Sequence, residues 1–488
     1  MIQLDYILKG IKLKETHGKL TIPVSRVVFD SRVAGPGDLF IAVPGVKSDG
    51  HSFIAEVIGK GVTAIICEKF PSALAEGVSF VQVENSGAAL GIAASNFYGN
   101  PSSAMKLVGV TGTNGKTTTA TLLYNLFTAL GHKCGLFSTV CNYILDKPTG
   151  ATHTTPDAVQ MNSLMKGMVD AGCEYCFMEV SSHSIDQDRI AGLKYAGAIF
   201  TNLTHDHLDY HKTFDNYLKV KKKYFDLLPS SAFAVINKDD RNGMVMVQNT
   251  KALVKTYALK SLADYTAKIV ESHIDGMQLH IGTHNVWTQL KGEFNAYNFL
   301  AVYSAAVCLG EDENEVLEAM SSLKEVRGRF ETISSGSGVT AIIDYAHTPD
   351  ALQNILTAIQ QLRHDKTERI IGVVGAGGDR DKTKRPVMGR IASIMCDKLI
   401  ITSDNPRSEE PETIISEVLK GVESDMRNKV TTIVNREEAI KTACLLAVKG
   451  DIILVAGKGH ETYQEIKGVK HHFDDREIVV SQFENMKH

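Results

Sequence analysis

The sequence predicts an α/β protein with three domains: a small N-terminal α/β domain, a central domain with a phosphate-binding loop and a mostly parallel sheet, and a C-terminal Rossmann-like domain. The chain has 488 residues, and one domain typically spans about 150. Short apolar runs alternate with segments of helix length, which is the pattern of βαβ units. A strand, a glycine turn and a helix also follow one another near residue 110. We place the domains at residues 1–100, 101–330 and 331–488.

The N-terminal block has apolar runs at 26–29, 39–43, 63–67 and 80–83, separated by glycine and proline turns. Residues 98–101 read as a linker. The net charge is −4, which gives no indication of nucleic-acid binding. The first 20 residues have no signal-peptide core, and no apolar run approaches the roughly 18 residues that span a bilayer. We therefore expect a cytoplasmic protein that binds neither nucleic acid nor membranes.

The central block opens with an apolar run at 106–111, and the turn that follows contains Gly112 and Gly115. A helix-forming run at 120–130 comes next, so backbone N–H groups and a helix N-terminus point to one place, as a polyphosphate requires. Lys116 can reach the terminal phosphates, and the Thr117 hydroxyl can bind Mg²⁺. The loop departs from the general pattern, because Val110 stands where a glycine is usual. We expect ATP and Mg²⁺ as ligands.

Further strands are predicted at 175–180, 196–201 and 233–236, and helices at 295–309 and 314–323. Glu179 ends the first of these strands and can hold Mg²⁺, or it can be an ordinary surface carboxylate. Residues 205–211 contain three histidines and two aspartates, which also suits a zinc hydrolase. The extra residue Tyr210 would displace a zinc ligand there. The lysine run 221–223 lies on a predicted helix, where such a run usually forms a solvated face.

The C-terminal block has apolar runs at 340–343, 370–374, 398–401, 430–434 and 452–455, with an amphipathic helix at 349–362. Arg380 occupies the last small-residue position of a dinucleotide-type loop, which argues against nicotinamide binding. Arg407 and Glu461 each follow a strand, so they should face one crevice. A guanidinium and a carboxylate together suit a zwitterionic amino acid. Cys173 and Cys176 have no second pair for a zinc site, and we expect buried free thiols.

Eight ordered motifs resemble those of the Mur ligases over nearly the whole chain. They are Gly-Thr-Asn-Gly-Lys-Thr-Thr (112–118), Met-Glu-Val-Ser-Ser-His (178–183), Thr-Asn-Leu-Thr-His-Asp-His-Leu-Asp-Tyr-His (201–211), Gly-Glu-Phe-Asn-Ala-Tyr-Asn (292–298), Arg-Gly-Arg-Phe-Glu (327–331), Asp-Tyr-Ala-His-Thr-Pro (344–349), Gly-Gly-Asp-Arg-Asp-Lys-Thr-Lys-Arg-Pro (377–386) and Asp-Asn-Pro-Arg (404–407). The match is to the type that extends UDP-N-acetylmuramoyl-alanyl-glutamate. The resemblance implies domains for the UDP-sugar, for ATP and for the incoming amino acid, in that order.

The resemblance also implies the site residues. It gives nucleotide contacts to Gly112, Thr113, Asn114, Gly115, Lys116, Thr117, Thr118, Asn295, Asn298, Arg329, Asp344 and His347. It gives contacts with the UDP-sugar dipeptide to Ser31, Thr154, Thr155, Ser181, Gln187 and Arg189. Metal ligands are Thr117, Glu179, His207 and, as a carbamate, Lys221; the catalytic group is Lys116, Glu179, His207 and Lys221. The amino-acid pocket comprises Arg380, Asp404, Asn405, Pro406, Arg407, Gly457 and Glu461.

The implied reaction phosphorylates a carboxylate, and an amine then attacks the acyl phosphate. Arg407 favours meso-2,6-diaminopimelate as the amine, because a guanidinium would bind its distal carboxylate and repel the ammonium of lysine. A lysine-adding ligase, a folylpolyglutamate synthetase, a nucleotide-binding regulatory module and the zinc hydrolase remain as alternatives. No residue stands out as the general base for the amine. We expect a monomer.

Overall fold

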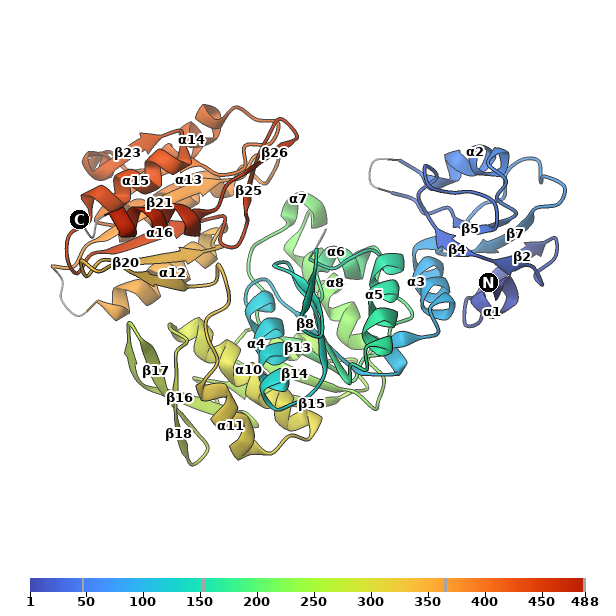
Figure 1. Ribbon diagram of the computed structural model, residues 1–488, viewed down its shortest axis with the longest axis horizontal. Coiled ribbons are helices and arrows are strands. Elements are labelled where there is room, and N and C mark those ends of the chain that lie inside the picture. Colours follow the sequence, from blue (N-terminus) through green and yellow to red (C-terminus); the bar gives the residue numbers. More distant parts are fainter. Residues whose placement is uncertain (46–47, 151–153, 364–366, 486–488) are drawn as a thin grey trace.

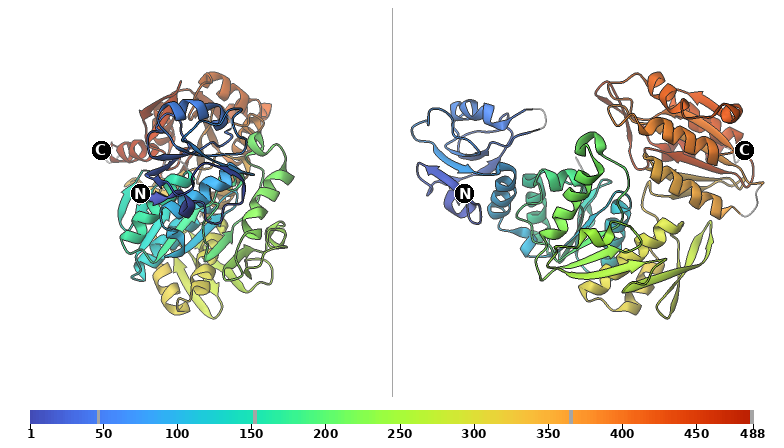
Figure 2. Two further views of the ribbon diagram at one scale, coloured as in Figure 1. Left: turned by 90° about the vertical axis from the view of Figure 1, so that its right-hand side faces the viewer. Right: turned by 180° about the vertical axis from the view of Figure 1, so that it is seen from behind.

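The computed structural model describes residues 1–45, 48–150, 154–363 and 367–485. Three large sheets of five, eleven and six strands follow one another along the chain, and Figure 1 shows the N-terminal and C-terminal ones standing on either side of the central one. The view from behind has the same arrangement (Figure 2). Within the described residues, no helix combines the length and apolar character needed to cross a bilayer.

The N-terminal sheet has five strands in the order β2-β7-β6-β5-β4. Its inner strand β5 is buried on both faces, because Leu39 and Ile41 pack in one apolar cluster and Phe40 packs in another. The elements are α1 (Leu4–Ile7), β2 (Leu13–His17), β4 (Arg26–Val28), β5 (Asp38–Ile41), α2 (Ile54–Gly59), β6 (Ala64–Cys67), β7 (Ser79–Val83) and α3 (Ser86–Phe97); β1 (Ile2–Gln3) and β3 (Pro23–Val24) form a separate pair. The four predicted strands are present, and β2 was not predicted.

The central sheet has eleven strands, and its middle part, β9-β12-β8-β13-β14-β15-β16, is parallel. The parallel strands are β8 (Lys106–Thr111), β9 (Cys134–Phe137), β12 (Tyr175–Glu179), β13 (Gly197–Phe200), β14 (Phe233–Asn237), β15 (Leu253–Ala258) and β16 (Tyr265–His273). Antiparallel strands extend both edges: β10 (Asn142–Ile144) and β11 (Lys147–Thr149) on one side, β17 (Gly276–Ile281) and β18 (His284–Thr288) on the other. Cys173 and Cys176 are buried free thiols, as predicted.

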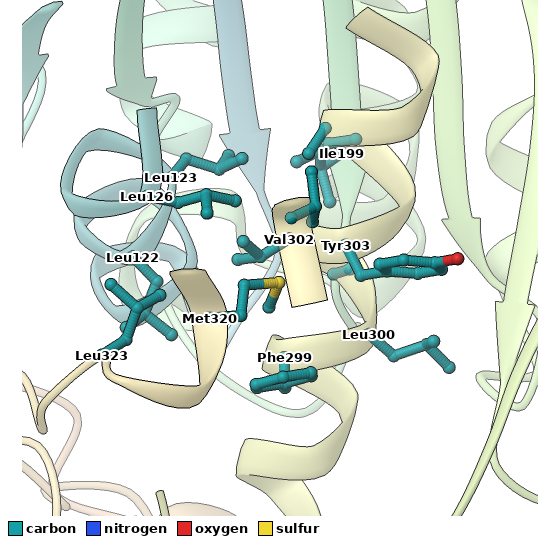
Figure 3. Packing of buried hydrophobic residues seen from close by; sticks show 14 of the residues in the cluster. Leu122, Leu123, Leu126, Ile199, Phe299, Leu300, Val302, Tyr303, Met320 and Leu323 are labelled. Atoms are coloured by element: carbon teal, nitrogen blue, oxygen red, sulfur yellow. The ribbon is translucent and has the colours of Figure 1, made fainter. Parts of the chain in front are cut away.

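One face of this sheet is covered by α4 (Lys116–Ala129), α10 (Glu293–Leu309) and α11 (Glu313–Ser321). Figure 3 shows Leu122, Leu123 and Leu126 of α4 facing Val302 of α10 in this core. Helix α4 begins at Lys116, four residues before the predicted start. The remaining helices are α5 (Ala158–Asp170), α6 (Ser182–Asp186), α7 (Leu208–His211), α8 (Phe214–Asp226) and α9 (Gly243–Met246).

The C-terminal sheet has six strands in the order β19-β20-β24-β21-β22-β23. They are β19 (Glu331–Ser334), β20 (Thr340–Asp344), β21 (Ile370–Ala376), β22 (Lys398–Ser403), β23 (Val430–Ile433) and β24 (Ile452–Ala456). One face packs against α12 (Pro349–Leu362), α13 (Lys384–Met395) and α14 (Pro411–Leu419), and the other against α15 (Arg436–Leu446) and α16 (Asp475–Asn485). A hairpin of β25 (Tyr463–Ile466) and β26 (Val469–His472) follows β24. Helices on both faces of a mostly parallel sheet make this the predicted Rossmann-like architecture.

Candidate active site

The phosphate-binding loop connects β8 to α4, at the carboxyl edge of the central sheet. Gly112 and Gly115 have φ values of 155° and 87°. A Cβ at Gly112 would lie 1.9 Å from the Thr201 hydroxyl, and one at Gly115 would lie 2.5 Å from the Asn298 amide oxygen. Both positions therefore require glycine, and the tight turn leaves the N-terminus of α4 open to a phosphate.

The loop borders a cavity of about 890 Å³ that lies between the central and C-terminal sheets. All seven loop residues from Gly112 to Thr118 line it. Glu179, His207, Lys221, Arg329, Asp344 and His347 line it too, although they come from widely separated parts of the chain. The tertiary structure thus brings most of the predicted nucleotide and metal residues to one place.

Lys116 lies across its own loop. Its ammonium donates hydrogen bonds to the carbonyl oxygens of Gly112 (3.0 Å) and Thr113 (2.7 Å). Burial lowers the pKa of Lys116, and the negative charge of Glu179 opposes that shift. A phosphate would supply the anionic partner that the carbonyl groups do not.

Glu179 is almost completely buried, so the alternative of a surface carboxylate is wrong. Its carboxylate accepts hydrogen bonds from the Thr117 hydroxyl (3.0 Å) and from the Thr139 N–H (2.6 Å). A buried carboxylate beside a hydroxyl on a cavity wall suits a hard cation such as Mg²⁺. In the part of the chain that the structure describes, no three His, Cys, Asp or Glu side chains are grouped so that they could hold a metal ion.

His207 lies on the same cavity wall with a φ of 55°, and its ring nitrogen is 3.4 Å from the Asp206 carboxylate. Desolvation lowers the pKa of His207 to about 3, with Asp206 opposing the shift and Lys116 adding to it. A neutral imidazole keeps a lone pair for a metal ion.

Lys221 lies on α8 and is only 1% exposed, so the expectation of a solvated face is wrong for this residue. Its amine donates to the Gly112 carbonyl (2.9 Å) and to the Thr111 hydroxyl (3.2 Å). Burial, reinforced by the charge of Lys116, holds the pKa of Lys221 well below its usual range. The amphipathic turn of α8 aims this lysine inward, which a run of three lysines does not reveal.

The residues predicted to contact the dipeptide form one hydrogen-bonded network beside Glu179. The Thr155 hydroxyl donates to the Glu179 carbonyl (2.8 Å) and accepts from the Ser181 N–H (3.1 Å). Arg189 donates to the Thr155 carbonyl (3.1 Å) and to the Gln187 amide oxygen (2.6 Å). Thr154, Thr155, Ser181 and Arg189 line the cavity, and Gln187 stands behind Arg189.

Ser31 is not part of this constellation. It lies in the N-terminal part, where its carbonyl accepts a hydrogen bond from Lys60 (2.7 Å). Figure 1 shows that part standing apart from the C-terminal sheet.

Arg329 connects the second half of the chain to the loop. Its guanidinium donates to the Thr117 hydroxyl (3.1 Å) and lies 4.4 Å from the Tyr345 ring. Asp344 accepts from the Phe330 N–H (2.7 Å), and burial raises the pKa of Asp344 to about 6 while Arg329 opposes the shift. Burial also lowers the pKa of His347 to about 4.

Asn295 and Asn298 occupy two different depths of this site. Asn298 lines the cavity and donates to the Asn295 amide oxygen (3.0 Å). Asn295 is buried behind it and donates to the Lys291 carbonyl (2.9 Å). Asn295 therefore supports Asn298, which faces the loop.

Sequence reasoning missed several residues of the cavity. Asp350, in the first turn of α12, accepts from the Asn114 amide (2.9 Å) and the Thr204 hydroxyl (3.3 Å), and so joins the C-terminal domain to the loop. Apolar and aromatic side chains of α10 and α12 form one end of the cavity: Phe294, Tyr297, Ala351, Ile355 and Ala358. The apolar periodicity of residues 349–362 predicts helix α12, but it does not indicate that the first turn, with Asp350, contacts another domain.

The predicted amino-acid pocket forms a cluster at the carboxyl ends of β22 and β24. We call Asp404, Asn405, Arg407, Lys458 and Glu461 the C-terminal cluster. The Asn405 amide donates to the Glu461 carboxylate (2.7 Å), and Arg407 donates to the Gly378 carbonyl (2.7 Å). The Arg407 guanidinium is also 3.6 Å from the Glu465 carboxylate.

Glycines allow the close packing of this cluster. Gly457 has a φ of 116°, and a Cβ there would lie 2.5 Å from the Asp404 carboxylate. A Cβ at Gly378 would lie 1.9 Å from the Pro406 carbonyl. A Cβ at Gly377 would be 3.0 Å from the Arg407 guanidinium and 3.8 Å from the Arg380 stem, so the two arginines flank one spot.

The cluster adjoins the cavity through two side chains. Arg380 and Tyr345 line the cavity, and the Tyr345 hydroxyl lies 3.4 Å from Glu461. The seven predicted residues of the amino-acid pocket are thus grouped at one edge of the C-terminal sheet, next to the phosphate-binding loop.

Three family models match the chain in sequence. The Mur ligase family catalytic domain matches residues 23–98, the Mur ligase middle domain matches residues 110–306, and the Mur ligase glutamate ligase domain matches residues 328–459.

Curated relatives match over almost the whole length. A protein of Parabacteroides distasonis is 57% identical over 476 residues, which cover 98% of each chain. A protein of Bacteroides fragilis is 55% identical over 482 residues, which cover 99% of each chain. Both are named UDP-N-acetylmuramoyl-L-alanyl-D-glutamate–2,6-diaminopimelate ligase. A solved structure of that name is 31% identical, with a TM-score of 0.70 over 100% of this chain and 99% of the other.

Proposed function

Because this chain belongs to the Mur ligase family, we infer that it is an ATP-dependent ligase that adds 2,6-diaminopimelate to UDP-N-acetylmuramoyl-L-alanyl-D-glutamate in peptidoglycan precursor synthesis. The observation that carries this function is the single cavity in which a phosphate-binding loop, a buried carboxylate and the dipeptide network meet, with the C-terminal cluster beside it. An acid, a nucleotide and an amine must come together in this reaction class.

We propose that residues 1–100 bind the UDP-sugar, residues 101–330 bind ATP and residues 331–488 bind the amino acid. Ser31 would contact the uridine part, and Thr154, Thr155, Ser181, Gln187 and Arg189 would hold the dipeptide. The three sheets and the positions of these residues support the division.

The chemistry that this chain must perform is activation of a carboxylate. A free carboxylate resists an amine, so its phosphorylation gives an acyl phosphate, and the amine displaces phosphate from it. Arg189 would orient the substrate carboxylate, since its guanidinium lines the cavity 3.1 Å from the Thr155 carbonyl. Lys116 would neutralise the charge of the transferred phosphoryl group, and Arg329 would hold the nucleotide beside Thr117.

Glu179, Thr117 and His207 fit a magnesium ion, since they offer a buried carboxylate, a hydroxyl and a neutral imidazole on one cavity wall. A bound Mg²⁺ would shield the negative charge of the phosphate oxygens.

We propose that Lys221 is carbamylated. Burial lowers the pKa of Lys221 and so favours the neutral amine, which can add to CO₂ and release one proton. The resulting carbamate is anionic and can support a second metal ion beside the loop. Growth with ¹³C-bicarbonate should give a carbamate carbon signal by NMR that disappears in Lys221→Ala. Lys222→Ala is the matched control, because Lys222 lies on the same helix but is paired with Asp226 (2.7 Å).

Arg407 supports the diaminopimelate assignment over the lysine-adding alternative. The guanidinium lies next to Gly377, 3.0 Å from where a Cβ would be, and its planar fork can donate to the distal carboxylate of the diamino diacid. Lysine has no such carboxylate, and its ammonium would be repelled. We also propose that the protein is cytoplasmic, acts on small molecules and is a monomer. Mass photometry can test the oligomeric state.

Phosphate release tests the function directly. The purified protein is given ATP, Mg²⁺ and UDP-N-acetylmuramoyl-L-alanyl-D-glutamate, with diaminopimelate, with lysine, or with neither. Turnover with diaminopimelate alone supports the assignment, turnover with lysine alone supports the lysine-adding ligase, and no turnover with either refutes both.

A further inference from the structure

Lys458 is a buried cation at the centre of the C-terminal cluster, and it is 0% exposed. Its ammonium lies 3.1 Å from the Asn405 amide oxygen and 3.2 Å from one Glu461 carboxylate oxygen, Oε2. The Asp404 carboxylate is 3.9 Å away. Lys458 therefore touches the polar side chains of the proposed amino-acid pocket from behind.

The ammonium fixes the orientation of the Asn405 amide. The amide oxygen accepts from Lys458 and from the Glu465 N–H (2.9 Å), while the amide nitrogen donates to Glu461 (2.7 Å). A flipped amide would place its NH₂ group against two donors and its oxygen against a carboxylate. One N–H of Asn405 remains for a ligand.

Because of this ammonium, the two carboxylate oxygens of Glu461 have different hydrogen-bond partners. Oε2 accepts from both Lys458 and Asn405, whereas Oε1 faces the Tyr345 hydroxyl at 3.4 Å. Tyr345 lines the cavity, so Oε1 is the Glu461 oxygen that contacts a residue of the cavity wall. It keeps acceptor capacity for an ammonium group.

The position of Lys458 is itself constrained. Its ammonium lies 5.5 Å from the Tyr463 ring centroid and 6.0 Å from the Phe473 ring centroid. Gly457, immediately before it, has a backbone conformation that suits glycine. Because Lys458 is itself fixed by its surroundings, it can fix the orientation of Asn405 and Glu461.

We propose that Lys458 is a positioning residue for the incoming diamino acid: its buried ammonium fixes Asn405 and Glu461 so that one amide N–H and one carboxylate oxygen face the substrate. This inference rests on the proposed function. Lys458 acts through these two side chains and does not touch the substrate. Its loss should therefore weaken recognition of diaminopimelate but not of ATP or the UDP-dipeptide.

The test is a steady-state comparison of Lys458→Met, which keeps a side chain of similar length without the charge. The KM for diaminopimelate should rise about 30-fold, because a buried carboxylate and amide lose their shared donor. The KM values for ATP and for the UDP-dipeptide should stay within about twofold of those of the unaltered protein. Lys420→Met, at an exposed position of the same domain, is the control and should leave all three unchanged.

An unchanged KM for diaminopimelate, or an equal rise of all three KM values, would overturn the inference. If Lys458→Met does not fold, the double variant Lys458→Met/Glu461→Gln removes both charges together and is compared with Glu461→Gln alone. A further rise in KM of less than about threefold supports action through Glu461, and a further rise of about 30-fold overturns it. Absence of phosphate release by the unaltered protein would instead refute the proposed function.

Discussion

The phosphate-binding loop and the C-terminal cluster are built in opposite ways. The loop is completed from two sheets, because Arg329 and Asp350 reach Thr117 and Asn114 from more than 200 residues away. The C-terminal cluster is completed within one sheet, from segments that follow β21, β22 and β24. The first site depends on how the domains meet, and the second depends on the fold of one domain.

The lysines of the loop and of the C-terminal cluster also differ in their partners. Lys116 and Lys221 donate to backbone carbonyls and to a hydroxyl, and burial lowers the pKa of each. Lys458 is surrounded by carboxylates and an amide oxygen. A site for a polyanion thus presents cations with neutral partners, whereas a site for a zwitterion has its charges balanced within the protein.

The largest effect is expected at the loop lysine. Lys116→Met should reduce kcat at least about 1,000-fold, because the variant lacks the loop ammonium that would neutralise the transferred phosphoryl group. Phosphate release under saturating substrates measures it, and Lys133→Met, an exposed lysine beyond α4, is the control. If kcat of Lys116→Met falls less than tenfold, the Lys116 ammonium does not depend on a bound phosphate as its anionic partner. The contrast between the loop and the C-terminal cluster would then be wrong.

The next effect is at the C-terminal cluster. Arg407→Ala should lower kcat/KM for diaminopimelate about 100-fold through loss of a charge-assisted pair, with the KM for ATP unchanged. Arg407→Lys should not restore it, because an ammonium lacks the planar fork. Arg390→Ala, exposed in the same domain and paired with Glu423, is the control. If the KM for ATP rises in parallel, the cluster is not independent of the loop.

A pH profile sharpens the contrast at Asp344. Its pKa of about 6 lies above the usual value for an aspartate, so the carboxylate gains a proton as the pH falls below 6. The kcat/KM for ATP should then fall about tenfold from pH 7 to pH 5 if the ionised form binds the nucleotide. Asp344→Asn should be less active and should lose this pH dependence. A profile that keeps its shape in the variant assigns the titration to another group.

The smallest effect concerns the contact between the sheets. Asn114→Ala and Asp350→Ala should each raise the KM for ATP about threefold, and the double variant should be no worse than either single one. The KM for diaminopimelate should not change. Additive effects would show that the Asn114–Asp350 hydrogen bond does not connect the loop to the C-terminal domain.

Local patterns explain why much of the fold was predictable. The helix at 349–362 begins and ends where predicted, since Pro349 follows a Thr348 cap and apolar residues recur with helical spacing. Strands β16 to β18 were missed, because their sequences mix polar and apolar residues and lack the apolar runs of the predicted strands. Lys221 and Lys458 were misjudged or overlooked because a charged residue in sequence gives no sign of its burial.

Short stretches of sequence were enough to predict the backbone of the loop, the buried strands and the residues at their carboxyl ends. These depend on glycine conformations and on apolar periodicity over a few neighbouring residues. Three features became visible only in the folded chain: the contact of Arg329 with Thr117, the burial of Glu179 and the contact of Lys458 with Asn405. Such contacts join residues that are far apart in the sequence, within one domain or between two, so local sequence cannot relate them.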